Sequence, residues 1–277
     1  MTHQLCPQPP LFPVKKTLIG MVHVRALPGT PKSRHSVKEL GAACVSEARA
    51  LQKAGFDALL LENMHDAPYI PGPHGPEIAA AMTAVAVSVR EAVGAMPIGI
   101  QILARGEREA LAVALAADCE FIRCENFVYS HVADEGLMVE ASAGPLLRYR
   151  RNIGAEHVRI ICDLKKKHAS HAITSDISLA DVIHGAEFFG ADGVIITGAA
   201  TGQPASISDV AAARKATALP VWIGSGVSPE QMEQLAPYAD AIIVGSYLKR
   251  EGHWTQPLDL ARCDEIAAAF KKAISPG

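Results

Sequence analysis

The sequence lacks the paired cysteines, the long apolar runs and the excess of basic residues that mark several large classes of protein. Its 6 cysteines form no C-x-x-C pair, so we expect neither a disulfide framework nor a structural zinc site. No apolar run approaches the ~20 residues that span a bilayer, and prolines interrupt the N-terminus where a signal peptide would be apolar. These absences predict a cytoplasmic protein without a transmembrane segment.

Charge and composition narrow the class further. The 26 Lys and Arg residues against 29 Asp and Glu residues give a formal net charge of −3, and no basic stretch is present that would attract nucleic acid. Nucleic acid is therefore not an expected partner. With 49% hydrophobic and 20% charged residues among 277, the chain has the composition of a folded globular protein rather than of a disordered one.

What the sequence has in quantity is short apolar runs rich in Ile, Val and Leu, separated by longer segments of helical period. Runs of this kind are typical of buried parallel strands. Eight of them occur, at 18–24, 57–63, 97–103, 120–126, 158–165, 192–198, 220–226 and 240–246. The segments between them are amphipathic, such as 36–55, which begins with Ser36 and ends on Gly55 as a capped helix does.

Strands and helices alternating in this way predict a single (β/α)8 TIM barrel, a fold of about 250 residues. A doubly wound sheet is the alternative, but no G-x-G-x-x-G sequence follows the first strand. We expect a Pro-rich N-terminal arm over residues 1–16 and one barrel domain over residues 17–277. Residues 127–157 are less regular, and we interpret them as a lid-like loop followed by a helix.

In such barrels the reactive groups come from the C-terminal ends of the strands and from the loops that follow them. Asp163 and Lys165 have the same parity, so a regular strand would point both side chains to one face. A carboxylate beside Arg or Lys is suited to proton transfer once its pKa is tuned, and equally to a structural ion pair. The candidate catalytic residues at the strand ends are His23, Glu62, Arg123, Asp163, Lys165 and His168.

Further alternatives remain open around the three lysines that follow the fifth strand. A desolvated Lys165 would be a Schiff-base nucleophile, whereas Lys166 and Lys167 are expected to be solvated as members of a charge run. A divalent metal on Glu62, Asp163 and nearby histidines is another alternative, because hard cations take carboxylate oxygens. No spacing motif supports this metal, and no other cofactor is predicted.

The loops after the last two strands both contain Gly-Ser. Glycine lets the backbone approach an anion closely, and barrels commonly bind phosphate after strands seven and eight. The alternative is that these glycines only turn the chain at the barrel rim. We favour a phosphate site, and its predicted residues are Gly224, Ser225, Gly226, Gly245 and Ser246, together with Thr197 and Gly198 after the sixth strand.

Several motifs of the sequence resemble those of one known family. The segment 19–23, with 27–31 after it, looks like the opening of the BtpA family. Segments 62–69, 163–168 and 197–202 resemble later motifs of that family in the same order, and the likeness runs from about residue 17 to 275. The resemblance implies a TIM barrel similar to the ribulose-phosphate-binding barrels. The family takes its name from a role in photosystem I biogenesis, and no catalytic residue is carried over from it.

Two functions from different classes are consistent with these features. The first is an enzyme acting on a small phosphorylated metabolite, a sugar or nucleoside phosphate, by isomerase, lyase or hydrolase chemistry. Isomerases and lyases need a proton moved beside a stabilised oxyanion. The second is a non-catalytic assembly or stability factor of the photosystem I biogenesis type. Acids and bases at several strand ends favour the enzyme, and the sequence leaves a homo-oligomer open.

Overall fold

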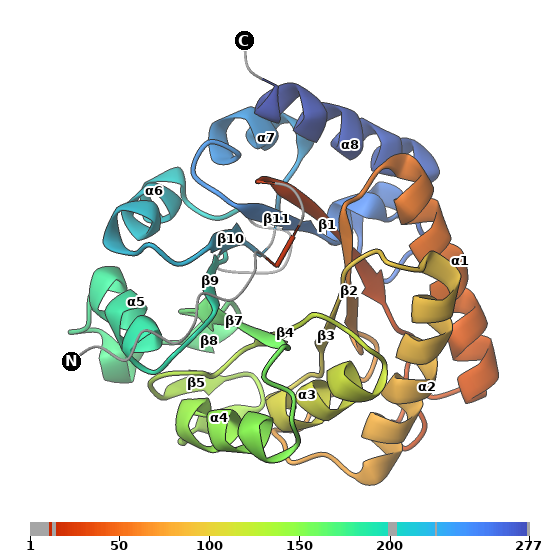
Figure 1. Cartoon of the computed structure of the whole chain (residues 1–277), viewed down its shortest axis with the longest axis horizontal. Coiled ribbons are helices and arrows are strands. Elements are labelled where there is room, and N and C mark those ends of the chain that lie inside the picture. The colour runs from red at the N-terminus through yellow and green to blue at the C-terminus, as the bar shows by residue number, and fades with distance from the viewer. Residues whose placement is uncertain (1–10, 13–14, 199–203, 225, 276–277) are drawn as a thin grey trace.

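The structure is a computed structural model that describes residues 11–12, 15–198, 204–224 and 226–275. Eight parallel strands close into a barrel in the order β1-β11-β10-β9-β7-β4-β3-β2, and helices surround it (Figure 1). The TIM barrel predicted from the sequence is confirmed, and the doubly wound sheet is excluded. The barrel strands are β1 (Thr17–His23), β2 (Ala58–Glu62), β3 (Ile98–Gln101), β4 (Phe121–Cys124), β7 (Arg159–Leu164), β9 (Gly193–Ile196), β10 (Val221–Ile223) and β11 (Ala241–Val244).

The helices form where the sequence supplies both an apolar face and end signals. Before α1, Ser36 and Glu39 make a reciprocal capping box, and Gly55 ends the helix at a φ of 96°, which favours glycine. The helices are α1 (Val37–Ala54), α2 (Pro76–Val93), α3 (Glu107–Ala116), α4 (Ala143–Asn152), α5 (Leu179–Phe188), α6 (Ile207–Ala216), α7 (Pro229–Leu235) and α8 (Leu260–Ile274). Three 3₁₀ turns are η1 (Ala172–Thr174), η2 (Ser246–Leu248) and η3 (Arg250–Gly252). Within the described residues, no helix combines the length and the apolar character needed to cross a membrane.

A second, small antiparallel sheet interrupts the alternation after β4. It consists of β5 (His131–Ala133) between β6 (Gly136–Met138) and β8 (Ala169–Ser170), the last coming from the loop after β7. The irregular segment predicted as a loop followed by a helix therefore contains a β-hairpin before α4. Because Asp134 and Glu135 at the tip of this hairpin line a cavity at the barrel mouth, the small sheet forms part of its wall.

The barrel interior is filled by every second residue of each strand, because successive side chains point to opposite sides of a sheet. Phe121 and Trp222 are the largest members of this inner cluster and meet edge to face with ring centroids 5.2 Å apart. Gly99 makes room for them, since a Cβ there would lie 2.1 Å from the Phe121 ring. The inner cluster comprises Ile19, Met21, Ala58, Leu60, Phe121, Ile161, Ile195, Trp222, Ala241 and Ile243.

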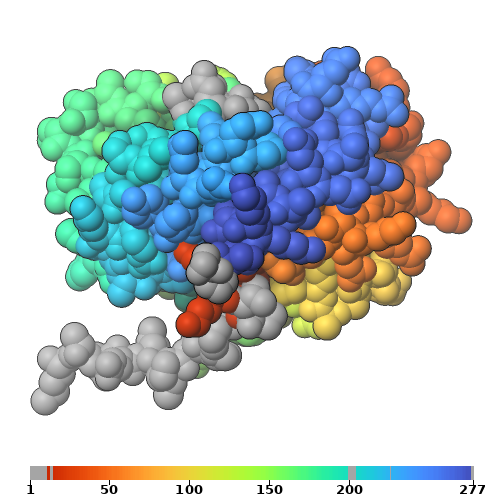
Figure 2. Space-filling view, turned by 90° about the horizontal axis from the view of Figure 1, so that it is seen from above, coloured from red at the N-terminus to blue at the C-terminus, as the bar shows by residue number. Residues whose placement is uncertain are grey.

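Part of the predicted N-terminal arm packs against the barrel. Residues 1–10, 13 and 14 lie outside the described residues, but the ring of Phe12 lies 5.4 Å from that of Trp222 and 5.9 Å from that of Phe121. Lys16 donates from its Nζ to the Ala236 carbonyl at 2.8 Å. Figure 2 shows the described residues of this segment, in red, at the lower edge of the molecule beneath the dark blue of α8. Phe12 thus covers the end of the barrel where the strands begin.

The close contact between Gly99 and Phe121 makes a prediction about stability. Gly99→Ala is expected to lower the free energy of unfolding by about 1–3 kcal/mol, because the added methyl group overlaps a ring that is packed on all sides. Gly144→Ala in α4 is the control, since its Cβ would lie 3.4 Å from the flexible end of Arg148 and alanine favours a helix. Chemical denaturation of both variants measures the difference. Equal stability of Gly99→Ala and the wild type would contradict this packing.

Candidate active site at the mouth of the barrel

The last inward-facing positions of the strands form one ring at the mouth. Six of these positions carry polar side chains and the last two carry glycine, in the order His23, Glu62, Gln101, Arg123, Asp163, Thr197, Gly224 and Gly245. Each stands two residues beyond a member of the apolar inner cluster or, for Gln101, two residues beyond Gly99. The strand pleat therefore brings groups from distant parts of the chain to one level. The candidate residues His23, Glu62, Arg123 and Asp163 lie there, and their catalytic roles stay predictions.

Arg123 and Asp163 form a buried, two-pronged ion pair. The Arg123 Nε and Nη2 atoms donate to the two carboxylate oxygens of Asp163 at 2.8 and 2.9 Å, and the two side chains are 5% and 2% exposed. Burial alone would lower the pKa of Arg123, but the adjacent Asp163 carboxylate outweighs it and raises the pKa further. The pair is therefore charged and fixed in place, and both oxygens of Asp163 are occupied.

His23 and Glu62 face one another beside this pair. The His23 Nε2 atom lies 3.8 Å from the Glu62 Oε2 atom, and both residues are 7% exposed. Burial lowers the pKa of His23 well below its usual value, and the positive charges of Lys249 and Lys167 act in the same direction. Burial raises the pKa of Glu62, although Arg123 and Lys167 oppose that rise. The result is a neutral imidazole next to a carboxyl group that holds its proton more readily than an exposed glutamate does.

The three consecutive lysines do not lie where the sequence pattern placed them. The strand ends at Leu164, and Lys165 has a φ of 50°, so its side chain leaves the barrel and donates to the Ile177 carbonyl at 3.1 Å. The expectation that Lys165 and Asp163 point to one face of the strand is therefore wrong. Lys166 instead pairs with Glu125 at 3.3 Å, and Lys167 lines the mouth. The expectation that these two lysines are merely solvated is also wrong.

His168 lies at the rim of the site rather than at its base. Its side chain is 43% exposed, and its Nδ1 atom lies 3.8 Å from the Asp134 carboxylate on the β5–β6 hairpin. This contact joins the loop after β7 to the small sheet. The position suits His168 to closing the cavity wall, and a catalytic role for it stays a prediction.

The glycine loops and the acid–base groups open onto one small cavity, here called the glycine niche, of about 30 Å³. Its walls are Met21, His23, Glu62, Met64, Arg123, Lys167, Gly224, Gly226, Gly245 and Ser246. A Cβ at Gly245 would lie 3.3 Å from His23 Nε2, and one at Gly224 would lie 3.0 Å from Arg123 Nη2. The missing side chains are therefore what leaves the niche open.

The residues of the predicted phosphate loops differ in whether they have a group free to bind an anion. The Gly224 amide donates to the Ile196 carbonyl at 2.9 Å as part of the sheet, so it is not free for an anion. Gly226 has a φ of 68°, a conformation that favours glycine. Ser225 lies outside the described residues. Thr197 carries a buried hydroxyl with no hydrogen-bond partner among the described residues, and Gly198 beside it is buried.

A larger cavity of about 270 Å³, here called the mouth cavity, adjoins the niche. Its apolar wall includes Met64, Ala67, Tyr69, Leu103 and Trp254, and its polar wall includes Gln101, Glu125, Glu135 and Lys166. The Gln101 Oε1 and Glu135 Oε2 atoms are buried acceptors without a partner in the described part of the chain. Buried acceptors of this kind are usually satisfied, so they indicate a ligand or water with hydrogen-bond donors.

Sequence reasoning missed Lys167, Glu135 and Trp254 as members of the site. Lys167 was hidden in a charge run, and the other two lie on loops whose path no periodicity reveals. The signal that would have favoured Trp254 is rarity, because it is one of only 2 tryptophans in the chain.

The metal alternative finds no support at the mouth. Across residues 11–12, 15–198, 204–224 and 226–275, no group of three or more His, Cys, Asp or Glu side chains is placed to hold a metal ion. At Asp163 the Arg123 guanidinium donates to both oxygens, and its positive charge disfavours a cation there.

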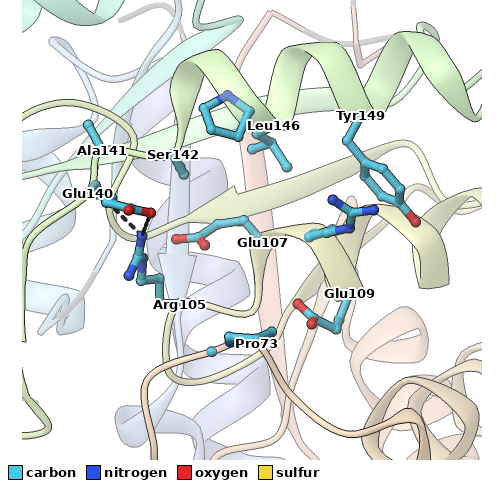
Figure 3. A pocket seen from close by; sticks show the side chains of 12 residues that line it. Pro73, Arg105, Glu107, Glu109, Glu140, Ala141, Ser142, Leu146 and Tyr149 are labelled. Atoms are coloured by element: carbon cyan, nitrogen blue, oxygen red, sulfur yellow. Dashed lines mark hydrogen bonds and ion pairs between the residues drawn. The ribbon is translucent and has the colours of Figure 1, made fainter.

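A separate cavity of about 200 Å³ lies between α3 and α4, outside the barrel (Figure 3). Glu107 points into it and is only 5% exposed, while Arg105 and Glu140 pair at its edge. Burial raises the pKa of Glu107 to about 7, and the nearby Glu125 carboxylate adds to the effect. Arg108 stacks over the Tyr149 ring at 3.9 Å on another wall.

The closed barrel defines the chain as a TIM barrel. It matches the BtpA family over residues 14–272 and belongs to that family. It is 44% identical to an uncharacterized mitochondrial protein of Caenorhabditis elegans, covering 90% of this chain and 91% of that protein. It is also 34% identical to the photosystem I biogenesis protein BtpA of a Synechocystis strain, covering 96% of this chain and 90% of the other. Among solved structures, N-(5′-phosphoribosyl)anthranilate isomerase of Pyrococcus furiosus is similar at a TM-score of 0.57 and 13% identity, covering 93% of this chain and 99% of that one.

The buried Arg123–Asp163 pair predicts an asymmetric effect of mutation. Arg123→Met is expected to lower the free energy of unfolding by about 3–5 kcal/mol, because it leaves the Asp163 carboxylate buried and unpaired. Replacing both partners, as Arg123→Met with Asp163→Leu, is expected to recover most of that loss. Arg151→Met, which breaks the exposed pair with Glu156, serves as the control and is expected to cost less than about 1 kcal/mol. Equal losses from the single and double changes at the mouth would show that the charges are not mutually dependent.

The raised pKa of Glu107 predicts a pH dependence of stability. An unfolded Glu releases its proton near pH 4.5, whereas folded Glu107 holds it to about pH 7, so the stability of the fold falls as the pH rises between these values. Glu107→Gln has no carboxyl proton to release, so this fall in stability should be absent from the variant. The free energy of unfolding of Glu107→Gln relative to wild type is expected to be about 1–3 kcal/mol higher at pH 8 than at pH 4. Denaturation curves at several pH values measure it, with Glu91→Gln on the exposed face of α2 as the control. A pH profile unchanged by Glu107→Gln would contradict the burial argument.

Proposed function

We propose that this protein is an enzyme that acts on a small phosphorylated metabolite, a sugar or nucleoside phosphate, by isomerase or lyase chemistry. The observation that carries the proposal is that the glycine niche and the mouth cavity share Glu62, Arg123 and Lys167 along their walls. A substrate whose phosphate occupies the niche would therefore extend past the Glu62 carboxyl group, the Arg123 guanidinium and the Lys167 amine into the larger cavity.

The phosphate would be held by the loops after the last two strands. Gly226, Gly245 and Ser246 supply a backbone that an anion can approach, at the position where TIM barrels commonly bind phosphate. Arg123 borders the same niche and brings positive charge close to the anion. Thr197 and Gly198 directly follow β9, where the unpartnered Thr197 hydroxyl would donate to the ligand.

Proton transfer would fall to Glu62 and His23. As a carboxylate, Glu62 would take a proton from a carbon next to a carbonyl, and the neutral imidazole of His23 would stabilise or protonate the oxygen that becomes negative. Both groups are buried among inner-ring neighbours, so they are held without reorganisation at the moment of reaction. The Arg123–Asp163 pair would fix the position of Arg123 beside the developing charge.

The similar proteins support the TIM-barrel fold, on which this proposal depends, and the reaction has to be tested by experiment. The Pyrococcus isomerase shares the barrel, but at 13% identity this likeness carries the fold alone. A second candidate function, a non-catalytic assembly or stability factor, is favoured by the 34% identity to a photosystem I biogenesis protein. The two are separated by a thermal-shift screen of phosphorylated metabolites, because a ligand bound only to the native state raises its apparent stability. A cytoplasmic location and a homo-oligomer remain predictions.

The phosphate site predicts the effect of a single added charge. Ser246→Asp is expected to weaken the binding of inorganic phosphate by about tenfold or more, because a carboxylate within a few ångströms of an anion in a partly buried site repels it. Aspartate is tolerated where a helical turn begins, so the fold should be kept. Isothermal titration with phosphate measures the affinity, and Ser246→Asn is the matched neutral control. Unchanged affinity in Ser246→Asp would place the phosphate elsewhere.

A further inference from the structure

The junction of the two cavities contains one amine without an ion-pair partner among the described residues. Glu62, Met64, Arg123 and Lys167 line both the glycine niche and the mouth cavity. Arg123 is held by Asp163, and Met64 carries only a thioether. The Lys167 amine, in contrast, forms no ion pair with a carboxylate in the described part of the chain. A substrate that spans the two cavities would pass directly beside this nitrogen.

We propose that Lys167 condenses with the carbonyl carbon of a phosphorylated aldehyde or ketone whose phosphate sits in the glycine niche. The inference rests on the proposed function and makes its substrate class more specific. It assigns to Lys167 the role of a catalytic residue, because its nitrogen would bond to the reacting carbon.

Three other lysines near the barrel mouth form hydrogen bonds or ion pairs with other groups. Lys165 turns away from the barrel and donates to the Ile177 carbonyl. Lys166 pairs with Glu125 at 3.3 Å. Lys249 is 1% exposed and pairs with Glu47 at 2.7 Å on the side of α1. These contacts engage the three amines with other partners, and neither Lys165 nor Lys249 lines either cavity.

The surroundings of Lys167 favour the neutral amine that the reaction needs. Burial lowers its pKa, and the fixed positive charge of Arg123 lowers it further, while the carboxylates of Glu62 and Asp163 act in the opposite direction. The same carboxyl group of Glu62 stands next to the junction as a proton carrier. Nucleophile, proton carrier and phosphate niche thus lie along one path through the site.

The proposed step balances without an oxidant or a reductant. The neutral Lys167 nitrogen forms a bond to the carbonyl carbon, the C=O π electrons move to the oxygen, and that oxygen takes up a proton. The nitrogen then releases a proton, the hydroxyl is protonated by an acid, and the C–O bond breaks with loss of water. The resulting protonated imine withdraws electrons from the adjacent carbon, so Glu62 can remove a proton there. Water later hydrolyses the imine and restores the amine.

Reductive trapping tests this assignment. The wild-type protein is incubated separately with glyceraldehyde 3-phosphate and ribulose 5-phosphate in the presence of sodium borohydride, which converts an imine into a stable secondary amine. Peptide mass spectrometry is expected to find the adduct on Lys167, at the mass of the probe less one oxygen, and excess inorganic phosphate is expected to suppress it. Lys167→Arg keeps a long basic side chain but cannot form an imine, so it should lose the adduct. Lys165→Arg is the matched control and should keep it.

The possible outcomes separate this inference from the function on which it rests. Phosphate binding by wild type and Lys167→Arg, with the adduct lost only in the latter, supports both. Phosphate binding without any phosphate-sensitive adduct, or with the adduct on another lysine, overturns the role of Lys167 and leaves the phosphate site standing. Absence of phosphate binding in the wild type overturns the proposed function, and this inference with it.

Discussion

Closure of eight parallel strands into a barrel is the constraint on which both the core and the site depend. It fixes which side chains of each strand point inward, because the pleat alternates with a period of two and a closed sheet has no edge at which the register can slip. The lower inward positions are apolar and pack around Phe121 and Trp222. The next inward-facing position of each strand toward the mouth belongs to the ring that includes His23, Glu62 and Arg123. This ring therefore continues the core directly.

The buried polar side chains of the ring need hydrogen-bond or ion-pair partners, because an unpaired buried charge costs several kcal/mol of stability. Arg123 and Asp163 meet this requirement almost completely through two hydrogen bonds. His23 and Glu62 meet it less completely, because they approach only to 3.8 Å and the His23 Nδ1 atom has no partner among the described residues. The first pair is therefore suited to holding its shape and the second to exchanging protons, although all four residues lie in the same ring.

The sequence predicts those features that follow from strand periodicity and fails on those that do not. His23, Glu62, Arg123 and Asp163 could be placed at the mouth because each lies on a strand whose apolar run is visible in the sequence. Lys165 could not be placed by parity, since the chain leaves the strand at Leu164 and turns with a positive φ at the next residue. Lys167, Trp254 and the hairpin tip at Glu135 reach the cavities from loops, whose paths depend on tertiary contacts that no local pattern encodes.

The two glycines of the ring explain why the glycine niche opens on one side of the barrel mouth. On six strands the ring position carries a polar group that fills space, whereas Gly224 and Gly245 carry nothing, and any Cβ there would press on Arg123 or His23. The glycine niche therefore lies against the ends of β10 and β11, whereas the larger mouth cavity lies against the polar ring positions of β2, β3, β4 and β7. In the proposed site, a ligand whose anion lies at the glycines would extend past Glu62 and Lys167 into the mouth cavity. The proposed orientation of a substrate thus depends on the two positions without side chains as much as on the polar groups of the ring.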